Sequence, residues 1–252
     1  MCRLLGYVAR APRSPRDMLG DAYGSFEDFS CGLHGDGWGA AWCEGATLRT
    51  AKEAIPAHES ATYRALSDRP FDAALVHYRW ATLALEVTTA NTHPFESATA
   101  AFAHNGSISP PGDLEAFLSP ENRADLEGTT DSERYFRMVL SAAQTEDLAD
   151  ALVSTVEQIA DTMSYTSLNA LMLTPESLYA VCFYSAASLP TDLPEDYYEM
   201  RYRQSSDAVM VASSGWKNDD WSPLANGTLM VIDRATGQTS FTSLRKKEAS
   251  HD

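Results

Sequence analysis

The chain has 252 residues, and 44% of them are hydrophobic, which is enough apolar material for a folded core and excludes a disordered chain. Its 19 Lys and Arg residues against 35 Asp and Glu residues give a formal charge of −16, a sign that repels phosphate backbones and anionic lipids. Apolar runs such as Ala73–Val76 stay far below the ~20 residues of a membrane-spanning helix. We therefore expect a soluble protein that binds neither nucleic acid nor membranes.

The first half of the chain predicts mainly strands with short helices between them. Ser14 followed by Pro15 is typical of a helix N-cap and first turn, and Glu44-Gly45 is typical of a hairpin turn. The predicted strands are Cys2–Arg10, Trp38–Trp42, Leu48–Ala51, Phe71–His77 and Thr99–His104. The predicted helices run from Ser14 through Phe26 and over His58–Leu66.

The second half begins with two amphipathic helices, predicted from the apolar spacing over Asp131–Ala143 and Glu146–Met163. Strands follow, at Leu168–Leu173, Ser177–Tyr184, Ala208–Ser213, Thr228–Asp233 and Thr239–Leu244. Strands, a helical pair and strands again favour an α+β fold of two sheets covered by helices over a doubly wound parallel sheet. We expect a single domain over residues 1–252, with a frayed tail after about residue 244.

Much of the negative charge is local. Between Asp113 and Asp161 the chain has twelve acidic residues and three arginines. A solvated helical face is the simplest interpretation, but a salt-adapted surface or a docking face for a cationic partner gives the same pattern. A non-catalytic acidic scaffold therefore stays open as an alternative function.

The four cysteines are Cys2, Cys31, Cys43 and Cys182, without a C-x-x-C pair or a zinc-finger histidine spacing. Their spacing predicts neither a metal site nor a disulfide framework. The apolar run after Arg3 is too short for a signal-peptide core, so we expect a cytoplasmic protein with reduced thiols. Cys2 is notable because it becomes the terminal residue if Met1 is removed.

Five segments carry chemical side chains. Each alone has an ordinary structural explanation, such as a turn for Asn-Gly or a helix cap for an aspartate. Their combination and order are informative. The segments are Cys2, His77-Tyr78-Arg79-Trp80-Ala81-Thr82, Asn91-Thr92-His93-Pro94-Phe95, His104-Asn105-Gly106 and Thr130-Asp131-Ser132-Glu133.

This ordered set, from Cys2 to about Ser213, resembles the glutaminase domain of class II glutamine amidotransferases, which are N-terminal-nucleophile hydrolases. The resemblance implies a four-layer α-β-β-α sandwich. The Met-Cys-Arg start and the Gly35-Asp36-Gly37-Trp38-Gly39 segment are similar to the small standalone branch, which includes glutathione-degrading γ-glutamyl amidases and the amidohydrolase of ergothioneine synthesis. By itself the glycine-rich segment predicts a tight turn before a strand beside the active site.

The resemblance implies a catalytic role for Cys2, Asn105 and Gly106. A terminal Cys2 would have a thiol of pKa ~8.5 and an α-amine of pKa ~7.7–8.0, so one residue would supply both nucleophile and base. The side-chain amide of Asn105 and the N–H of Gly106 would form the oxyanion hole.

The substrate-binding residues implied are Arg79, Trp80, Thr82, His93 and Asp131. Arg79 suits an α-carboxylate and Asp131 an α-ammonium, so the pair would select the zwitterionic end of a γ-glutamyl group. Trp80, Thr82 and the His93 loop would form the pocket wall, and we expect a structural or orienting role for His93.

One departure concerns the leaving group. Where ammonia-channelling synthases of this family have His-Gly after the Arg-Trp-Ala-Thr run, this chain has Leu83-Ala84, and we expect no synthase half within its 252 residues. The sequence therefore predicts an amidohydrolase without cofactor or metal, acting on glutamine or a small-molecule γ-glutamyl compound. A glutaminase subunit that supplies ammonia to a separate synthase is the alternative within enzymes, and a homo-oligomer is a further possible assembly.

Overall fold

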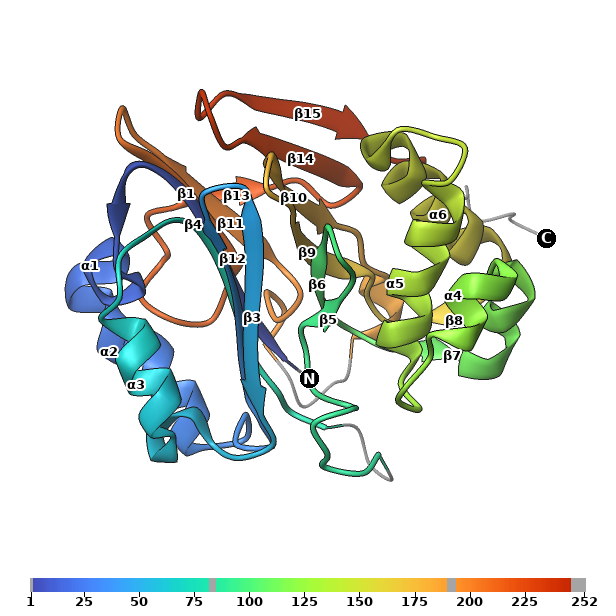
Figure 1. Ribbon diagram of the computed structural model, residues 1–252, viewed down its shortest axis with the longest axis horizontal. Coiled ribbons are helices and arrows are strands. Elements are labelled where there is room, and N and C mark those ends of the chain that lie inside the picture. Colours follow the sequence, from blue (N-terminus) through green and yellow to red (C-terminus); the bar gives the residue numbers. More distant parts are fainter. Residues whose placement is uncertain (1, 82–84, 190–193, 246–252) are drawn as a thin grey trace.

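A computed structural model describes residues 2–81, 85–189 and 194–245. Two large antiparallel sheets face each other, and helices cover the outer face of each sheet (Figure 1). The order of layers is therefore helix, sheet, sheet, helix. This arrangement confirms the predicted α-β-β-α sandwich.

The first sheet has seven strands in the order β13-β11-β12-β1-β4-β2-β3. Its strands are β1 (Arg3–Arg13), β2 (Trp38–Glu44), β3 (Thr47–Glu53), β4 (Phe71–Tyr78), β11 (Met200–Gln204), β12 (Ala208–Ser213) and β13 (Ser222–Leu224). In β1, Leu5 and Tyr7 pack toward the outer helices while Leu4 and Val8 pack toward the second sheet. Both faces are buried, which explains why this strand reads as a continuous apolar run.

The helices outside this sheet are shorter than predicted. Ser14 is the N-cap of the first helix, since its Oγ accepts the N–H of Asp17 at 3.1 Å, but Gly20 at φ +54° ends that helix after five residues. A left-handed glycine is a common helix terminator. The elements of this layer are α1 (Pro15–Leu19), η1 (Gly20–Ala22), α2 (Tyr23–Glu27), η2 (Asp28–Cys31), η3 (Ala57–Glu59) and α3 (Ala61–Ser67).

The second sheet has six strands in the order β15-β14-β10-β9-β6-β5. These are β5 (Phe95–Glu96), β6 (Ala101–Asn105), β9 (Asn169–Leu173), β10 (Ser177–Cys182), β14 (Thr228–Asp233) and β15 (Thr239–Ser243). The two predicted amphipathic helices, α5 (Asp131–Ala142) and α6 (Leu148–Thr162), cover its outer face. The remaining elements are β7 (Ile108–Ser109), η4 (Pro111–Phe117), α4 (Pro120–Ala124), β8 (Ser164–Tyr165) and η5 (Ala186–Ser188).

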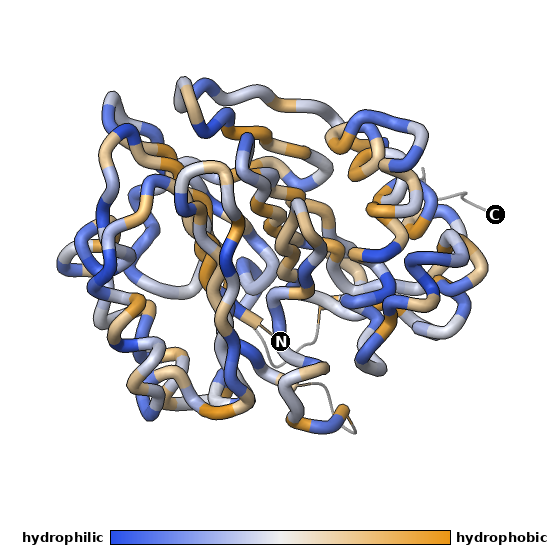
Figure 2. The backbone as a smooth tube through the Cα atoms, in the orientation of Figure 1, coloured by the Kyte–Doolittle hydropathy of each residue, from blue (hydrophilic) through white to orange (hydrophobic). Residues whose placement is uncertain are grey.

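Apolar side chains concentrate between the layers, and the inner strands are the most hydrophobic parts of the backbone trace (Figure 2). The two sheets come close at β1, where a Cβ on Gly6 would lie 2.9 Å from Cδ2 of Leu178 on β10. A side chain there would require the ends of Leu178 and Leu171 to move. In the described part of the chain, no helix has both the length and the apolar character needed to cross a membrane.

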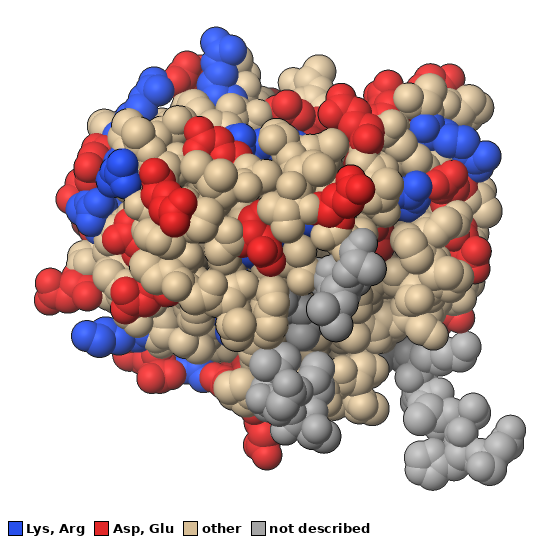
Figure 3. All heavy atoms as spheres, turned by 90° about the horizontal axis from the view of Figure 1, so that it is seen from below, with Lys and Arg blue, Asp and Glu red and all other residues tan. Residues whose placement is uncertain are grey.

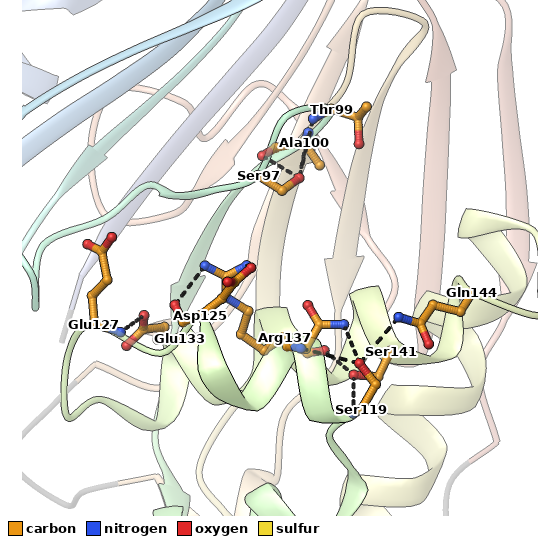
Figure 4. A network of polar contacts seen from close by, with 11 residues as sticks. Ser97, Thr99, Ala100, Ser119, Asp125, Glu127, Glu133, Arg137, Ser141 and Gln144 are labelled. Carbon is orange, nitrogen blue, oxygen red and sulfur yellow. Dashed lines mark hydrogen bonds and ion pairs between the residues drawn. The ribbon is translucent and has the colours of Figure 1, made fainter.

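Some acidic side chains between Asp113 and Asp161 form hydrogen bonds and ion pairs within the protein. Glu133 is 2% exposed, and its carboxylate accepts the N–H groups of Glu127 and Gly128, each at 2.8 Å. Arg137 pairs with Asp125 at 3.2 Å on the same helical layer (Figure 4). On the face seen from below, other carboxylates are scattered rather than gathered into one patch (Figure 3).

Candidate active site

Cys2 directly precedes β1, beside the end of β4 and the end of β6, and it is 8% exposed. Its backbone nitrogen donates to Oδ1 of Asn105 at 2.9 Å, and its Sγ contacts the carbonyl oxygen of Trp80 at 3.9 Å. Burial raises the pKa of the Cys2 thiol, and the positive charge of Arg79 opposes that rise. Burial thus favours the protonated thiol, so a thiolate at this position needs a base close by.

Asn105 is the last residue of β6 and is fully buried, opposite Asn169 of β9. Because its Oδ1 is taken by the nitrogen of Cys2, its Nδ2 faces elsewhere, and Nδ2 has no hydrogen-bond partner among the described residues. Buried amide donors are nearly always paired. A free donor beside a cysteine is the arrangement that an oxyanion would require.

Gly106 continues from Asn105 and lines the pocket. A Cβ at this position would collide with the carbonyl oxygen of Ser167. Only glycine therefore allows the backbone to run this close to the loop before β9.

Arg79 follows β4 and is held through its backbone. Its N–H donates to the carbonyl of Gly37 at 2.8 Å, and its carbonyl accepts the N–H of Asp36 at 3.1 Å. The Asp36 carboxylate then accepts the N–H of Ala81 at 2.8 Å. The Gly35–Gly39 segment is thus the predicted turn before a strand, and it also positions the Arg79–Ala81 segment.

The guanidinium of Arg79 is oriented by backbone carbonyls rather than by a carboxylate. Nη2 donates to the carbonyl of Glu86 at 3.0 Å and Nη1 to that of Asp36 at 3.5 Å. Arg79 has no salt bridge with a described residue, although it is only 2% exposed. Its charge remains available for an anion that enters the pocket.

Asp131 is the first residue of α5, and Thr130 is the N-cap, since its Oγ1 accepts the N–H of Glu133 at 3.2 Å. One oxygen of Asp131, Oδ2, accepts the N–H of Ile108 at 2.7 Å. The other, Oδ1, has only a long contact of 3.4 Å with the hydroxyl of Ser132. Asp131 therefore has one oxygen fixed by the backbone and one oxygen with spare acceptor capacity.

His104, in the predicted His-Asn-Gly segment, is hydrogen-bonded through both ring nitrogens. Its Nε2 lies 2.9 Å from the carbonyl of Ser167 and therefore donates to it, which leaves Nδ1 to accept the hydroxyl of Ser132, also at 2.9 Å. Burial lowers the pKa of His104. A neutral ring of fixed tautomer connects β6 to α5, and the spacing of Ser132 and Ser167 gave no signal of this contact.

A small cavity, partly open to solvent, brings most of the sequence-predicted residues together. The predicted residues that line it are Cys2, Arg79, Trp80, His93, Gly106 and Asp131. Asn105 lies behind this wall, in contact with Cys2. Thr82 falls outside the described residues.

Asn91 also lines the cavity and has a positioning contact that sequence reasoning missed. Its Oδ1 accepts the N–H of Thr129 at 2.9 Å, and its Nδ2 donates to the carbonyl of Glu86 at 3.3 Å. Asn91 thus links the loop that contacts Arg79 with the loop before α5. Its place two residues before His93 in an already notable segment could have drawn attention to it.

His93 packs on aromatic neighbours. Its ring lies 4.1 Å from the ring of His77 and 4.7 Å from that of Phe95, centroid to centroid. Burial lowers the pKa of His93 well below 6.5, so its ring is neutral near neutral pH. The expected orienting role stays a prediction.

Comparison with known proteins agrees with this geometry. The family model for class II glutamine amidotransferases matches residues 1–252. An uncharacterized protein of Methanocaldococcus jannaschii is 27% identical over 259 residues, which cover 92% of this chain and 69% of that protein.

Two solved structures share the fold. A glutamine aminotransferase class-II domain protein from Silicibacter pomeroyi has a TM-score of 0.67 at 20% identity, with 96% of this chain and 99% of that chain covered. The glutamine phosphoribosylpyrophosphate amidotransferase of B. subtilis has a TM-score of 0.70 at 17% identity and covers 98% of this chain, but only 50% of its own chain is covered. With the family match over its full length and its two facing antiparallel sheets, this chain belongs to the class II glutamine amidotransferases and has the N-terminal-nucleophile hydrolase fold.

Proposed function

We propose that this protein is an amidohydrolase that cleaves the γ-amide of glutamine or of a γ-glutamyl compound through a thioester on Cys2. The observation that carries the proposal is the position of Asn105, whose Oδ1 binds the nitrogen of Cys2 while its buried Nδ2 has no described partner. One side chain thus contacts the base and offers a donor for the oxyanion. The proposal requires removal of Met1, which would turn the nitrogen of Cys2 into a free amine.

The first chemical step is a proton transfer within Cys2. The neutral amine takes the thiol proton, and the thiolate attacks the γ-carbonyl carbon of the substrate. Burial raises the pKa of the thiol, so the adjacent amine supplies the base that the thiol needs. Asn105 holds that amine by accepting one of its N–H groups.

The attack moves the carbonyl electron pair onto oxygen, where Nδ2 of Asn105 and the N–H of Gly106 stabilise the negative charge. Loss of one such donor typically costs ~3–4 kcal/mol of transition-state stabilisation. When the intermediate collapses, the C–N bond breaks and the protonated amine of Cys2 transfers its proton to the departing nitrogen. The products of this half-reaction are the thioester and ammonia or a larger amine.

Water completes the cycle. The amine of Cys2 accepts a proton from the water that attacks the thioester carbonyl, the C–S bond breaks, and glutamate leaves while the thiol regains its proton. The same oxyanion donors serve both half-reactions. No additional base is required.

Opposite charges at two sides of the cavity favour a zwitterionic substrate. Arg79 is buried, with its guanidinium held by the carbonyls of Glu86 and Asp36, and it suits the α-carboxylate. Oδ1 of Asp131 suits the α-ammonium.

The test is release of glutamate from L-glutamine, glutathione and other γ-glutamyl amides, with intact mass used to confirm the loss of Met1. We expect turnover in the wild type and a loss of about 10⁴-fold or more in Cys2→Ala. Cys31→Ser, which removes an exposed thiol, is the matched control and keeps wild-type activity. Equal turnover in Cys2→Ala, or activity in protein that retains Met1, would contradict the mechanism.

A second probe tests substrate recognition. N-acetylglutamine lacks the α-ammonium and is expected to react at least about 10-fold less efficiently than glutamine, because the contact with Asp131 is lost. If glutamine is the only compound of the panel that is cleaved, and its cleavage is slow, the alternative of an ammonia-supplying subunit is supported.

A further inference from the structure

Two histidines without a catalytic role lie against Cys2. His77 is near the end of β4 and His93 is in the loop before β5, and the two are 0% and 4% exposed. The Sγ of Cys2 and one ring nitrogen of each histidine all lie within 4.8 Å of one another. The three residues come from segments far apart in the sequence, so the fold alone brings their donor atoms together.

The two imidazoles differ from His104 in their hydrogen bonding. Both nitrogens of His104 are bonded, whereas no ring nitrogen of His77 or His93 hydrogen-bonds to a residue that the structure describes. Leaving a buried polar atom unpaired costs about 1–3 kcal/mol. The two neutral rings therefore offer two unused lone pairs in one place, which points to a ligand that accepts them.

Each of the two imidazoles can offer one lone pair to a metal ion. Neutral imidazoles can coordinate an ion without first losing a proton. The thiol of Cys2 is the third donor and has to be deprotonated.

We propose that Cys2, His77 and His93 form a binding site for Zn²⁺ that switches the enzyme off. One thiolate and two imidazoles are donors that Zn²⁺ prefers, and three protein ligands leave one tetrahedral position open. Neighbouring ligand atoms around such an ion are about 3.3–3.8 Å apart. Side-chain rotations that move each donor atom by about 1 Å would therefore bring the three atoms to coordination distance.

The α-amine of Cys2 supplies the fourth ligand once Met1 is removed, which is the part of this inference that rests on the proposed function. Nitrogen and sulfur of the same residue would then hold the ion in a chelate ring. A coordinated amine keeps hydrogen atoms, so it can still donate to Oδ1 of Asn105. Binding in this way leaves the oxyanion side of the pocket unchanged.

The binding reaction involves no change of oxidation state. The Cys2 thiol releases one proton to solvent, the Zn–S bond forms, and the hydrated ion loses the waters that the protein ligands replace. A zinc-bound thiolate and amine can serve neither as nucleophile nor as base. The expected consequence is reversible inhibition of the amidohydrolase, relieved by a chelator.

The experiment uses Co²⁺ as a spectroscopic substitute for Zn²⁺ on chelator-treated protein with Met1 removed. We expect binding of one ion per chain, with a thiolate-to-cobalt charge-transfer band in the near ultraviolet and tetrahedral d–d bands in the visible, both abolished by added Zn²⁺. Cys2→Ala should remove the charge-transfer band, and His93→Gln should weaken Co²⁺ binding at least about 10-fold. Far-UV circular dichroism checks folding, and His77→Gln is a second variant at the other imidazole.

Two matched controls remove donors elsewhere. Cys31→Ser deletes an exposed thiol and His58→Gln a partly exposed imidazole, and both should bind Co²⁺ like the wild type. The absence of the charge-transfer band in wild-type protein, or its survival in Cys2→Ala, would overturn the proposal. So would unchanged binding in His93→Gln and His77→Gln together.

Glutamate release separates this inference from the proposed function. A metal-free protein that cleaves glutamine but neither binds Co²⁺ nor is inhibited by Zn²⁺ refutes the metal site alone. A protein that shows the Co²⁺ spectrum but cleaves no γ-glutamyl amide refutes the proposed function and leaves the binding site standing.

Discussion

The two halves of the candidate site are held in place by different kinds of contact. On the seven-stranded sheet, the segment after β4 is fixed mainly through backbone groups, as in the contacts of Arg79 with Gly37 and Asp36. On the six-stranded sheet and α5, side chains do most of the positioning, as in the bonds of His104 to Ser132 and of Asp131 to Ile108. Backbone contacts survive most substitutions, whereas a side-chain network depends on the identity of each member. The second half should therefore be the more sensitive to mutation.

After the loss of Cys2 itself, the largest effect on turnover is expected at Asn105, where the two halves meet. Asn105→Asp keeps an oxygen for the nitrogen of Cys2 but replaces the Nδ2 donor, so kcat should fall by about 10²–10³-fold. Asn105→Ala removes both functions and should lower kcat at least as much. Steady-state kinetics on glutamine or the best γ-glutamyl substrate provides the measurement. Near-wild-type kcat in the aspartate variant would exclude Nδ2 as an oxyanion donor.

Gly106→Ala is expected to destabilise the fold by about 3 kcal/mol, because the new methyl group meets the carbonyl of Ser167. Gly112→Ala is the matched control, since a Cβ there has no heavy atom within 4 Å. Urea unfolding of the two variants measures the difference. Equal midpoints would show that the β6 end can shift to admit a side chain.

Asp131→Asn should act mainly on substrate binding. The amide oxygen can still accept the N–H of Ile108, while the negative charge facing the substrate ammonium is lost. We expect KM to rise about 10-fold or more with kcat nearly unchanged. A fall in kcat at constant KM would instead place Asp131 in the chemical step.

The smallest effect is a pH dependence shared by both halves. Burial lowers the pKa values of His77, His93 and His104, so below pH 6.5 the unfolded chain binds more protons than the folded chain. The free energy of unfolding should thus fall as the pH decreases from 7 to 5. His93→Gln should reduce this slope. A pH-independent free energy would contradict neutral buried rings.

Sequence alone could predict the order of the layers and several of the residues that line the candidate site, because apolar spacing and compact motifs are local features. The helices after Asp131 and the hairpin at Gly45 were found in this way. The strands β11 and β13 were missed because β11 has charged residues at Arg201 and Arg203 and β13 has only three residues. Periodicity is weak in such elements.

The contacts that complete the site could not be predicted, since they join residues distant in sequence. Nothing in the order of residues places Ser132 and Ser167 on opposite sides of the His104 ring, or His77 against His93. Likewise, no metal site was predicted, because that prediction considered only the spacing of the cysteines. The proposed ligands come from distant segments that the fold brings together. The Asp36 contact with Ala81 was hidden for the same reason, although its turn was foreseen.

The tight sheet contact at Gly6 has a consequence for catalysis at a distance. Cys2 and Asn105 belong to different sheets, so the thickness of the apolar layer between them sets how far the nucleophile lies from its oxyanion donor. A displacement of about 1 Å can cost about 10²-fold in rate. The apolar core between the sheets thus helps to set the distance between Cys2 and Asn105. Replacing Gly6 by a larger residue against Leu178 would change this distance and lower the rate without contacting a catalytic group.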